Sequence, residues 1–493
     1  MESSDKEQGK KKVPEVRTFT VPFDLEAIKE NLSIASNAPS KTSKKQIINQ
    51  AFKYHSQGNI QEAAKHYQYF MDQGFDDPIV FSNYGTILKN LGKLKEAELL
   101  LRNAIELNPD FAIAHSNLGN VLKDLGNLKA AEISYQTAIQ LKPDFAEAYL
   151  NLGIIFKDLG QLQNAENSYR KAIELNPDLD EAHLNLGIIL NELGKLKELI
   201  NFSQSTIDSK KVNEGYKLLA LLNIVIAKLL QKEFVGILVH IKKINSLISK
   251  GVVNTIKDTN TRKHILTYAR FISSLYPLLK KDNKNINFEK IPHFGESHCL
   301  SFAHQYLSLY SQVKSIQPVL IIGGKAWNFS NKKNNKWKDS LIQQLKNHTY
   351  SNIVFISFGE IDCRKDEGIL IYAINNDIDI LEVCKNTING YLDYMEEILS
   401  SNYSQRYYFG VPAPIREKEL QDDLDIKRIE MIKIYNSLLK QEVLVRGSFF
   451  LDVYKLTSTE NGENNNLYMC DKNHLSPKCL SILFENYLCK ANI

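Results

Sequence analysis

The stretch AIAHSNLGNVLKDLGNLKAAEISYQTAIQLKPDF, residues 112–145, decides the fold of the first half of this chain, because its pattern returns every 34 residues. One proline series and two glycine series keep this spacing: Pro109, Pro143 and Pro177; Gly85, Gly119, Gly153 and Gly187; Gly58, Gly92, Gly126, Gly160 and Gly194. Each proline ends a unit because it cannot continue a helix. Small residues allow paired helices to approach, and tyrosines fill the space between them: Gly119, Ala97, Ala131 and Ala165; Tyr67, Tyr135 and Tyr169. The period predicts five units of two helices each over residues 44–213, with atypical units at both ends.

A 34-residue unit of two helices is typical of the tetratricopeptide repeat (TPR). One asparagine recurs in every unit, two positions before the small residue of the first helix: Asn49, Asn83, Asn117, Asn151 and Asn185. A carboxamide both donates and accepts hydrogen bonds, so such a ladder can hold the backbone of an extended polypeptide. The array resembles the TPR region of O-linked N-acetylglucosamine transferases, and this resemblance implies a peptide-binding ladder. The alternative is that the asparagines cap helices or join neighbouring repeats.

The regions around the repeats differ in composition. Residues 1–43 are polar and predict a flexible arm, and residues 214–287 predict a helical connector that ends in a polar linker. In residues 288–493, apolar runs at 318–324, 352–359, 406–412 and 447–453 alternate with amphipathic stretches at 297–310, 376–400, 423–441 and 475–489. This alternation predicts an α/β domain with a parallel sheet and helices on both faces. The expected fold class is therefore multidomain, an all-α TPR solenoid followed by an α/β domain.

Unusual turns follow the predicted strands. In IPHFGESHCLSF, residues 291–302, Ser297 comes directly after an apolar run, and MCDKNHLSP places Asp471 and His474 just before the last helix. Because the carboxyl ends of parallel strands share one edge of a sheet, we expect these side chains to meet there. A serine nucleophile needs a histidine base and a carboxylate that orients the base. Each residue taken alone has another explanation. Ser297 could be a helix N-cap, His474 a surface histidine, and Asp471 a turn residue.

Four blocks in this order resemble the SGNH, or GDSL-like, hydrolase family. GES contains Ser297, GKAWNF begins at Gly324, GEID ends at Asp362, and DKNH contains the Asp471 and His474 pair. The resemblance covers roughly residues 288–490 and implies a three-layer, flavodoxin-like α/β domain with a parallel sheet. It implies that Ser297, Asp471 and His474 are catalytic, and that the backbone amides of Ser297 and Gly324 bind an oxyanion.

The chain departs from the family pattern at two positions. Glu296 replaces the usual aspartate before the serine, and Ile361 stands where the family has an asparagine that donates to the oxyanion. Losing one such donor costs about a hundredfold or more in rate. Arg364 is close enough in sequence to supply charge for an oxyanion or an anionic substrate, although Asp362 and Arg364 could also form a structural ion pair. Cys363 and Cys470 adjoin the same edge and offer a thiol alternative.

Composition limits the other functions. With 61 Lys and Arg against 57 Asp and Glu, the net charge of +4 gives no basic surface for nucleic acid. The N-terminus lacks the apolar segment of a secretory signal and no run is long enough to span a bilayer, so we expect a cytoplasmic protein without a membrane partner. Neither a metal site nor a cofactor is implied.

The preferred interpretation is a TPR protein that binds an extended polypeptide and carries a serine esterase or acyl-hydrolase, or an acyltransferase if a sugar hydroxyl rather than water resolves the acyl-enzyme. Acylated glycans or small esters are the expected substrates. The alternative is a non-catalytic TPR adaptor with a degenerate hydrolase fold, or one whose second domain recognises sugar without cleaving it.

Overall fold

The computed structural model describes residues 43–279, 288–309, 311–348, 351–364, 368–415, 423–471 and 473–491. The predicted flexible arm, apart from Ser43, and the polar linker at 280–287 lie outside the described residues. The chain divides into two compact units, Met1–Leu186 and Gly187–Ile493.

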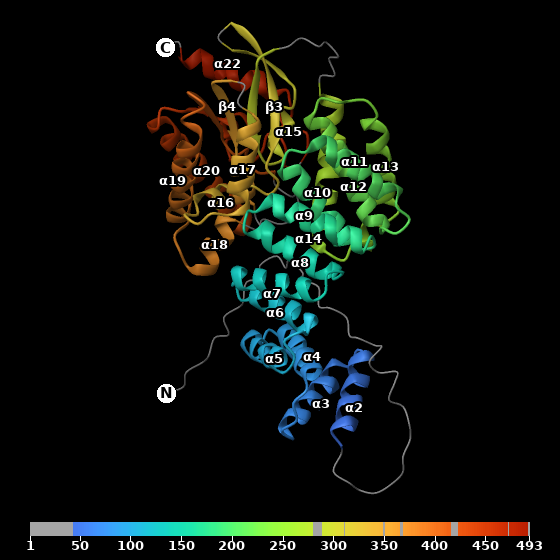
Figure 1. Ribbon diagram of the computed structural model, residues 1–493. Helices are drawn as coiled ribbons and strands as arrows, with labels where there is room; N and C mark the ends of the chain where they lie inside the picture. Colours follow the sequence, from blue (N-terminus) through green and yellow to red (C-terminus); the bar gives the residue numbers. More distant parts are fainter. Residues whose placement is uncertain are drawn as a thin grey trace, which may run out of the picture. The chain divides into compact units, whose positions relative to one another are not determined.

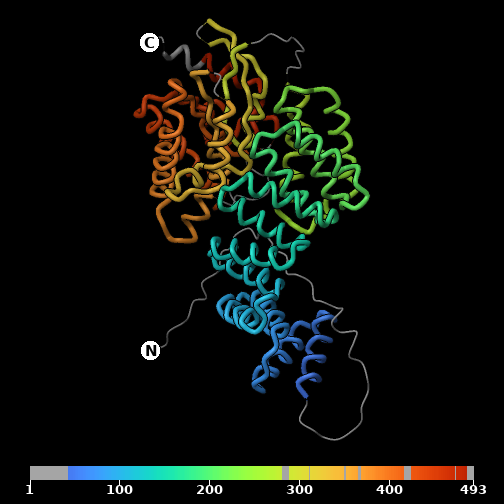
Figure 2. Tube along the Cα trace, viewed as in Figure 1, coloured from blue at the N-terminus to red at the C-terminus, as the bar shows by residue number. Residues whose placement is uncertain are grey.

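The first unit is a series of helix pairs, and the tube in Figure 2 follows them from blue to cyan. Its helices are α2 (Lys44–Ser56), α3 (Ile60–Asp72), α4 (Pro78–Asn90), α5 (Leu94–Leu107), α6 (Ala112–Asp124), α7 (Leu128–Leu141), α8 (Ala146–Asp158), α9 (Leu162–Leu175) and the first part of α10 (Asp180–Glu192). The two helices of a predicted repeat pack against each other, as α6 does on α7 and α8 on α9. The 34-residue period thus predicted the helix pairs correctly.

Glycines of two kinds recur every 34 residues along this chain, and the structure gives a reason for each kind. Gly126 ends α6 with a φ of +79°, a backbone conformation that side chains with a Cβ rarely adopt. Gly119 lies inside α6, where an added Cβ would come within 2.7 Å of the Tyr135 ring. Tyr135 itself is fully buried. The first glycine is therefore needed for the turn, and the second for the contact between paired helices.

The second unit begins with four further helices. They are α11 (Leu196–Asp208), α12 (Glu214–Leu230), α13 (Ile237–Ser249) and α14 (Thr259–Leu275), with short 3₁₀ turns η1 (Val252–Thr255) and η2 (Tyr276–Leu278). Helix α12 contains the most apolar stretch of the chain and is buried over most of its length, as a core helix should be. Of the helices in the described ranges, none combines the length and apolarity needed to cross a bilayer.

A six-stranded sheet forms the centre of the α/β domain (Figure 1). Its strands are β1 (Lys290–Gly295), β2 (Tyr306–Leu309), β3 (Gln312–Leu320), β4 (Ile353–Ser357), β5 (Gln405–Phe409) and β6 (Phe449–Leu451). They lie in the order β2-β3-β1-β4-β5-β6, and every neighbouring pair is parallel except β2 with β3. The predicted α/β class is confirmed, but the sheet is only mostly parallel.

The prediction of one amphipathic element at 297–310 was wrong. The segment forms a four-residue helix, α15 (His298–Ser301), and then turns into strand β2. The turn passes through His304, whose φ of +57° lies in the left-handed region. A helix cannot continue through that backbone conformation, so the chain leaves α15 and enters β2, which pairs with β3 as an antiparallel neighbour.

Apolar residues alternate between the two faces of the sheet, as the pleat requires. On β4, Val354 and Ile356 face one core, and Ile353 and Phe355 face the other. The first core is covered by α16 (Ala326–Ser330), α17 (Lys336–Asn347), α18 (Ile369–Asn376), α19 (Ile380–Leu399) and α20 (Asp423–Val445). The second is covered by α21 (Val453–Thr457) and α22 (Cys479–Ala491). Helices therefore cover both faces.

The connector helices pack against the α/β domain within the second unit. His304 Nε2 lies 2.6 Å from the Leu229 carbonyl oxygen at the end of α12. Gln317 on β3 donates to the neighbouring Leu230 carbonyl at 3.0 Å. These bonds satisfy carbonyls that the last turn of a helix leaves without an intrahelical partner.

Candidate functional site

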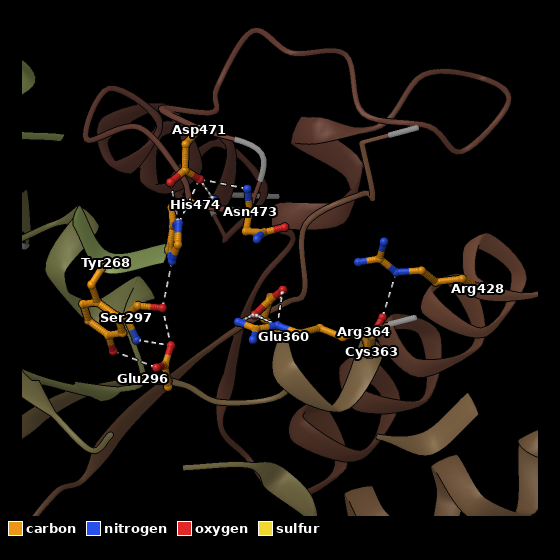
Figure 3. Close-up of polar contacts among 10 residues, drawn as sticks. All are labelled: Tyr268, Glu296, Ser297, Glu360, Cys363, Arg364, Arg428, Asp471, Asn473 and His474. Atoms are coloured by element: carbon orange, nitrogen blue, oxygen red, sulfur yellow. Dashed lines mark hydrogen bonds and ion pairs between the residues drawn. The ribbon is translucent and has the colours of Figure 1, made fainter. Parts of the chain in front are cut away.

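The three residues predicted to act together meet at the carboxyl end of β1. Ser297 lies two residues after the end of β1, and His474 Nε2 lies 2.8 Å from Ser297 Oγ. The other ring nitrogen of His474, Nδ1, lies 2.8 and 2.9 Å from the two carboxylate oxygens of Asp471. Figure 3 shows the three side chains in line. This is the arrangement in which a carboxylate orients an imidazole toward a hydroxyl.

The local alternatives for these residues are resolved by their contacts. Ser297 occupies the N-cap position of α15, but its side chain makes no capping hydrogen bond. His474 is only 1% exposed, so it is no surface histidine. Asp471 does hold the local turn, since it accepts the backbone N–H of Asn473 and of His474 at 2.8 Å each. Burial raises the pKa of Asp471, but His474 and these amides outweigh burial and leave the pKa below its usual value.

Glu296 binds the nucleophile candidate directly. Its carboxylate accepts hydrogen bonds from the backbone N–H and the hydroxyl of Ser297, and from the Tyr268 hydroxyl at 2.7 Å. Burial raises the pKa of Glu296, but the positive charge of Arg364 and these hydrogen bonds overcome burial, so the pKa is lowered. Glu296 is therefore an anion beside Ser297.

Helix α14 of the connector covers this site. The Phe271 ring stacks on the His474 imidazole, with centroids 3.8 Å apart, and Tyr268 contributes the hydrogen bond to Glu296. Ser297 is 2% exposed. Sequence reasoning missed both α14 residues, because nothing in a helix almost 30 residues before the serine marks it as part of the site.

The residues of the third block have other partners than expected. The Asp362 carboxylate accepts the backbone N–H groups of Ala326 and Trp327 at 2.8 and 3.0 Å, so it fixes the loop after β3. Burial raises the pKa of Asp362 to about 6 despite these bonds. Arg364 pairs with Glu360 at 2.8 Å. The suggested ion pair between Asp362 and Arg364 was wrong.

The Glu360 and Arg364 pair is half-buried and acts on the histidines of the site. Burial raises the pKa of Glu360, but the charge of Arg364 and its hydrogen bond bring the pKa down to about 2. Burial, with His474 nearby, lowers the pKa of His298 to about 4, so this imidazole is neutral. Arg364 thus already has a carboxylate partner.

The two predicted oxyanion donors are engaged within the chain. The Ser297 amide donates to Glu296, and the Gly324 amide donates to the Ile321 carbonyl at 3.0 Å. Gly324 lies in the turn that follows β3. A Cβ added at this position would come within 3.0 Å of the Phe358 ring. Ile361 is buried in the 3₁₀ turn η3 (Ile361–Cys363). These two amides must change partners before they can bind a ligand.

The thiol alternative has little chemical support. Burial raises the pKa of Cys470 to about 12 and that of Cys363 well above its ordinary value. Both thiols are therefore protonated near neutral pH, whereas the thiolate is the reactive form. In the described part of the chain, no three His, Cys, Asp or Glu side chains are grouped to hold a metal ion.

The asparagine ladder has a structural role in the middle of the array. Three members are buried and bond to the first helix of a neighbouring repeat: Asn117 donates to Ser82 (3.2 Å), Asn151 donates to Asn120 (3.3 Å), and Asn185 accepts from Lys157 (3.2 Å). Asn83 is half-buried and Asn49 is exposed. These contacts are those of the inter-repeat alternative, and peptide binding by the ladder stays a prediction.

Comparison with known proteins identifies the repeats. Models described as TPR repeat and tetratricopeptide repeat match residues 85–126, 119–160, 146–179 and 168–200. No curated protein matches the chain. Similar solved structures include MamA from Desulfovibrio magneticus RS-1, with 24% identity, 30% of this chain and 83% of that chain covered, and a TM-score of 0.28.

Two more solved structures show the same likeness. YrrB, described as a TPR protein with an unusual peptide-binding site, is 20% identical and covers 42% of this chain and 100% of its own, with a TM-score of 0.33. A tetratricopeptide repeat protein from Parabacteroides merdae is 16% identical and covers 46% and 98%, with a TM-score of 0.34. The matching family models identify residues 85–200 of this chain as tetratricopeptide repeats, which precede a mostly parallel α/β domain.

Proposed function

We propose that this protein binds a polypeptide through its tetratricopeptide repeats and carries an SGNH-like serine esterase or acyl-hydrolase site in its α/β domain. The observation that carries the enzymatic part is the hydrogen-bonded series Ser297, His474 and Asp471. The sequence blocks that resemble the SGNH family supply these three residues in the family's order. Acylated glycans and small esters are the proposed substrates.

In the proposed reaction, Ser297 Oγ attacks the ester carbonyl while His474 Nε2 takes the hydroxyl proton. His474 then gives this proton to the leaving alcohol, and an acyl-enzyme remains. Water, deprotonated by the same imidazole, hydrolyses the acyl-enzyme and returns Ser297. Asp471 keeps Nδ1 protonated and stabilises the imidazolium. Glu296 accepts both the hydroxyl and the backbone amide of Ser297. It must therefore release the hydroxyl, which then turns to His474 Nε2, and release the amide, which then binds the oxyanion.

The second candidate is a TPR adaptor without catalysis, and specific contacts favour it. Both amides that the family resemblance assigns to the oxyanion have partners in the chain, Ile361 provides no donor, and Ser297 is almost inaccessible. In this alternative the repeats bind a protein partner, and the second domain is kept for recognition.

Labelling with a fluorophosphonate probe separates the two candidates. The proposed enzyme should be labelled at a single serine, and Ser297→Ala and His474→Ala should both abolish labelling. Ser301→Ala is the matched control, because Ser301 is a fully buried serine one helical turn away. Equal probe uptake by wild type and Ser297→Ala would contradict the esterase and leave the adaptor.

A further inference from the structure

A cleft beside the candidate site contains a cation and an amide that the proposed reaction does not use. It is lined by Glu360, Cys363, residues 411–414, Arg428, Ile432, Met469 and Asn473. Arg428 comes from α20 and Asn473 from the segment that also carries Asp471 and His474. Asn473 directly precedes the proposed base, His474, so the cleft adjoins the candidate site.

Arg428 is held in place and keeps its charge available. Its Nε donates to the Cys363 carbonyl oxygen at 2.9 Å, which leaves the two terminal nitrogens of the guanidinium. No carboxylate among the described residues pairs with Arg428. Figure 3 shows the guanidinium and the Asn473 carboxamide turned toward each other across a gap.

The other charges around the cleft cancel. The Glu360 carboxylate also lines it, but Arg364 binds Glu360 through three hydrogen bonds of 2.8–3.3 Å. Arg428 is thus the surplus charge, and the apolar walls, from Val411 and Ile432 to Met469, strengthen its attraction for an anion. A planar guanidinium binds carboxylate and phosphate groups through two parallel hydrogen bonds.

The cleft adjoins a second cleft that reaches the histidines of the candidate site, and it suits a small group. A second cleft shares Glu360, Val411 and Pro412 with it and reaches His298, whose ring lies 5.2 Å from that of His474. The first cleft leaves about 10 Å³ for the centre of a water-sized sphere, which is the room of about one water molecule. It can therefore hold only one small charged end of a larger ligand.

We propose that Arg428 and Asn473 bind a small oxyanion, a carboxylate or a phosphate, carried by the substrate of Ser297. This inference rests on the proposed esterase, and it narrows the substrate to an acylated compound with a negative charge near the ester, such as an acylated acidic or phosphorylated sugar. Arg428 supplies charge and two donors, and the Asn473 amide supplies one more.

Binding of sugars to the full-length Ser297→Ala protein, which cannot turn over an ester, tests the inference by titration calorimetry. The probes are glucuronate, glucose 6-phosphate and glucose as the neutral control. We expect saturable binding of at least one anionic sugar and none of glucose, and the better ligand distinguishes carboxylate from phosphate. Arg428→Gln should weaken binding by about tenfold to a hundredfold, because a charge-assisted hydrogen bond is lost.

Lys427→Gln is the matched control. It removes the same charge from the neighbouring, exposed position of α20, and should leave the affinity unchanged. Circular dichroism of each variant confirms that it is folded. If neither anion binds, or if Arg428→Gln binds as tightly as Lys427→Gln does, the inference is wrong. Every protein in this titration lacks Ser297, so the titration tests only anion binding by the cleft. The esterase proposal is tested independently, by fluorophosphonate labelling of Ser297.

Discussion

The ring of Phe271 lies flat on the imidazole of His474, with centroids 3.8 Å apart and planes 18° from parallel. Phe271 belongs to a connector helix, and His474 to the last loop of the α/β domain before α22. The site residues are thus enclosed by an element outside the sheet and its covering helices.

Replacing Phe271 should expose the site. Asp471 already orients His474, so the stacked ring mainly limits access to Ser297. We expect Phe271→Ala to increase the rate of fluorophosphonate labelling several-fold and to lower the free energy of unfolding by about 3–5 kcal/mol, since it leaves a cavity. Phe271→Leu should lower stability less and is the variant to use if the alanine protein does not fold. Slower labelling in a folded Phe271→Leu protein would mean that the ring positions His474.

Removing the Tyr268 hydroxyl should destabilise the second unit. Tyr268→Phe leaves a buried oxygen of the charged Glu296 without its donor, and we expect a loss of about 1–3 kcal/mol. Urea unfolding followed by tryptophan fluorescence measures this loss, because both tryptophans, Trp327 and Trp337, lie in that unit. Tyr454→Phe is the control, since that hydroxyl bonds a neutral carbonyl at 3.3 Å. Equal stability of the two variants would show that Glu296 does not depend on Tyr268.

Stability of the second unit should rise with pH between about 4 and 6.5 through His304. Burial, with Lys232 and Lys290 nearby, lowers the pKa of His304 to about 4, so the unfolded chain binds a proton in this range and the native chain does not. The stabilisation is therefore complete above pH 6.5 and is lost as the pH falls through 4. Asp362, with its pKa raised to about 6, binds a proton in the native state and opposes this slope below pH 6.

The variant His304→Asn isolates the contribution of this histidine. Asparagine tolerates the left-handed backbone of that position and does not titrate. We expect the slope of unfolding free energy against pH to fall by about 1.4 kcal/mol per pH unit, the value for one proton. The measurement is urea unfolding at several pH values between 4.5 and 6.5. An unchanged slope would mean that His304 titrates normally in the folded protein.

The asparagines of the repeats should differ in their effect on stability. Asn151 is fully buried and donates to Asn120, which also accepts the Tyr135 hydroxyl at 2.7 Å. We expect Asn151→Ala to lower local stability by about 1–3 kcal/mol, visible as faster hydrogen exchange in α8. The exposed Asn49 is the control, and Asn49→Ala should leave exchange unchanged. Equal exchange in both variants would contradict the inter-repeat role and favour a ladder that serves a ligand.

Part of the candidate site could be predicted from residues alone. Ser297, Asp471 and His474 were chosen because unusual turns at the ends of parallel strands must share one edge, and the structure brings these three together. The partners of Glu360, Asp362 and Arg364, close to these three residues, could not be predicted. Glu360 binds Arg364, and Asp362 holds the amides of the loop after β3, because side-chain direction within a short 3₁₀ turn depends on what packs around it.

The sequence by itself determined the repeats and the α/β class, because a 34-residue period and the alternation of apolar runs are local patterns that the backbone must follow. Only the tertiary structure decided that α14 covers Ser297, that Arg428 faces Asn473, and that the asparagines of the inner repeats are buried. These are contacts between residues distant in sequence, and the packing of whole elements, rather than local spacing, selects them.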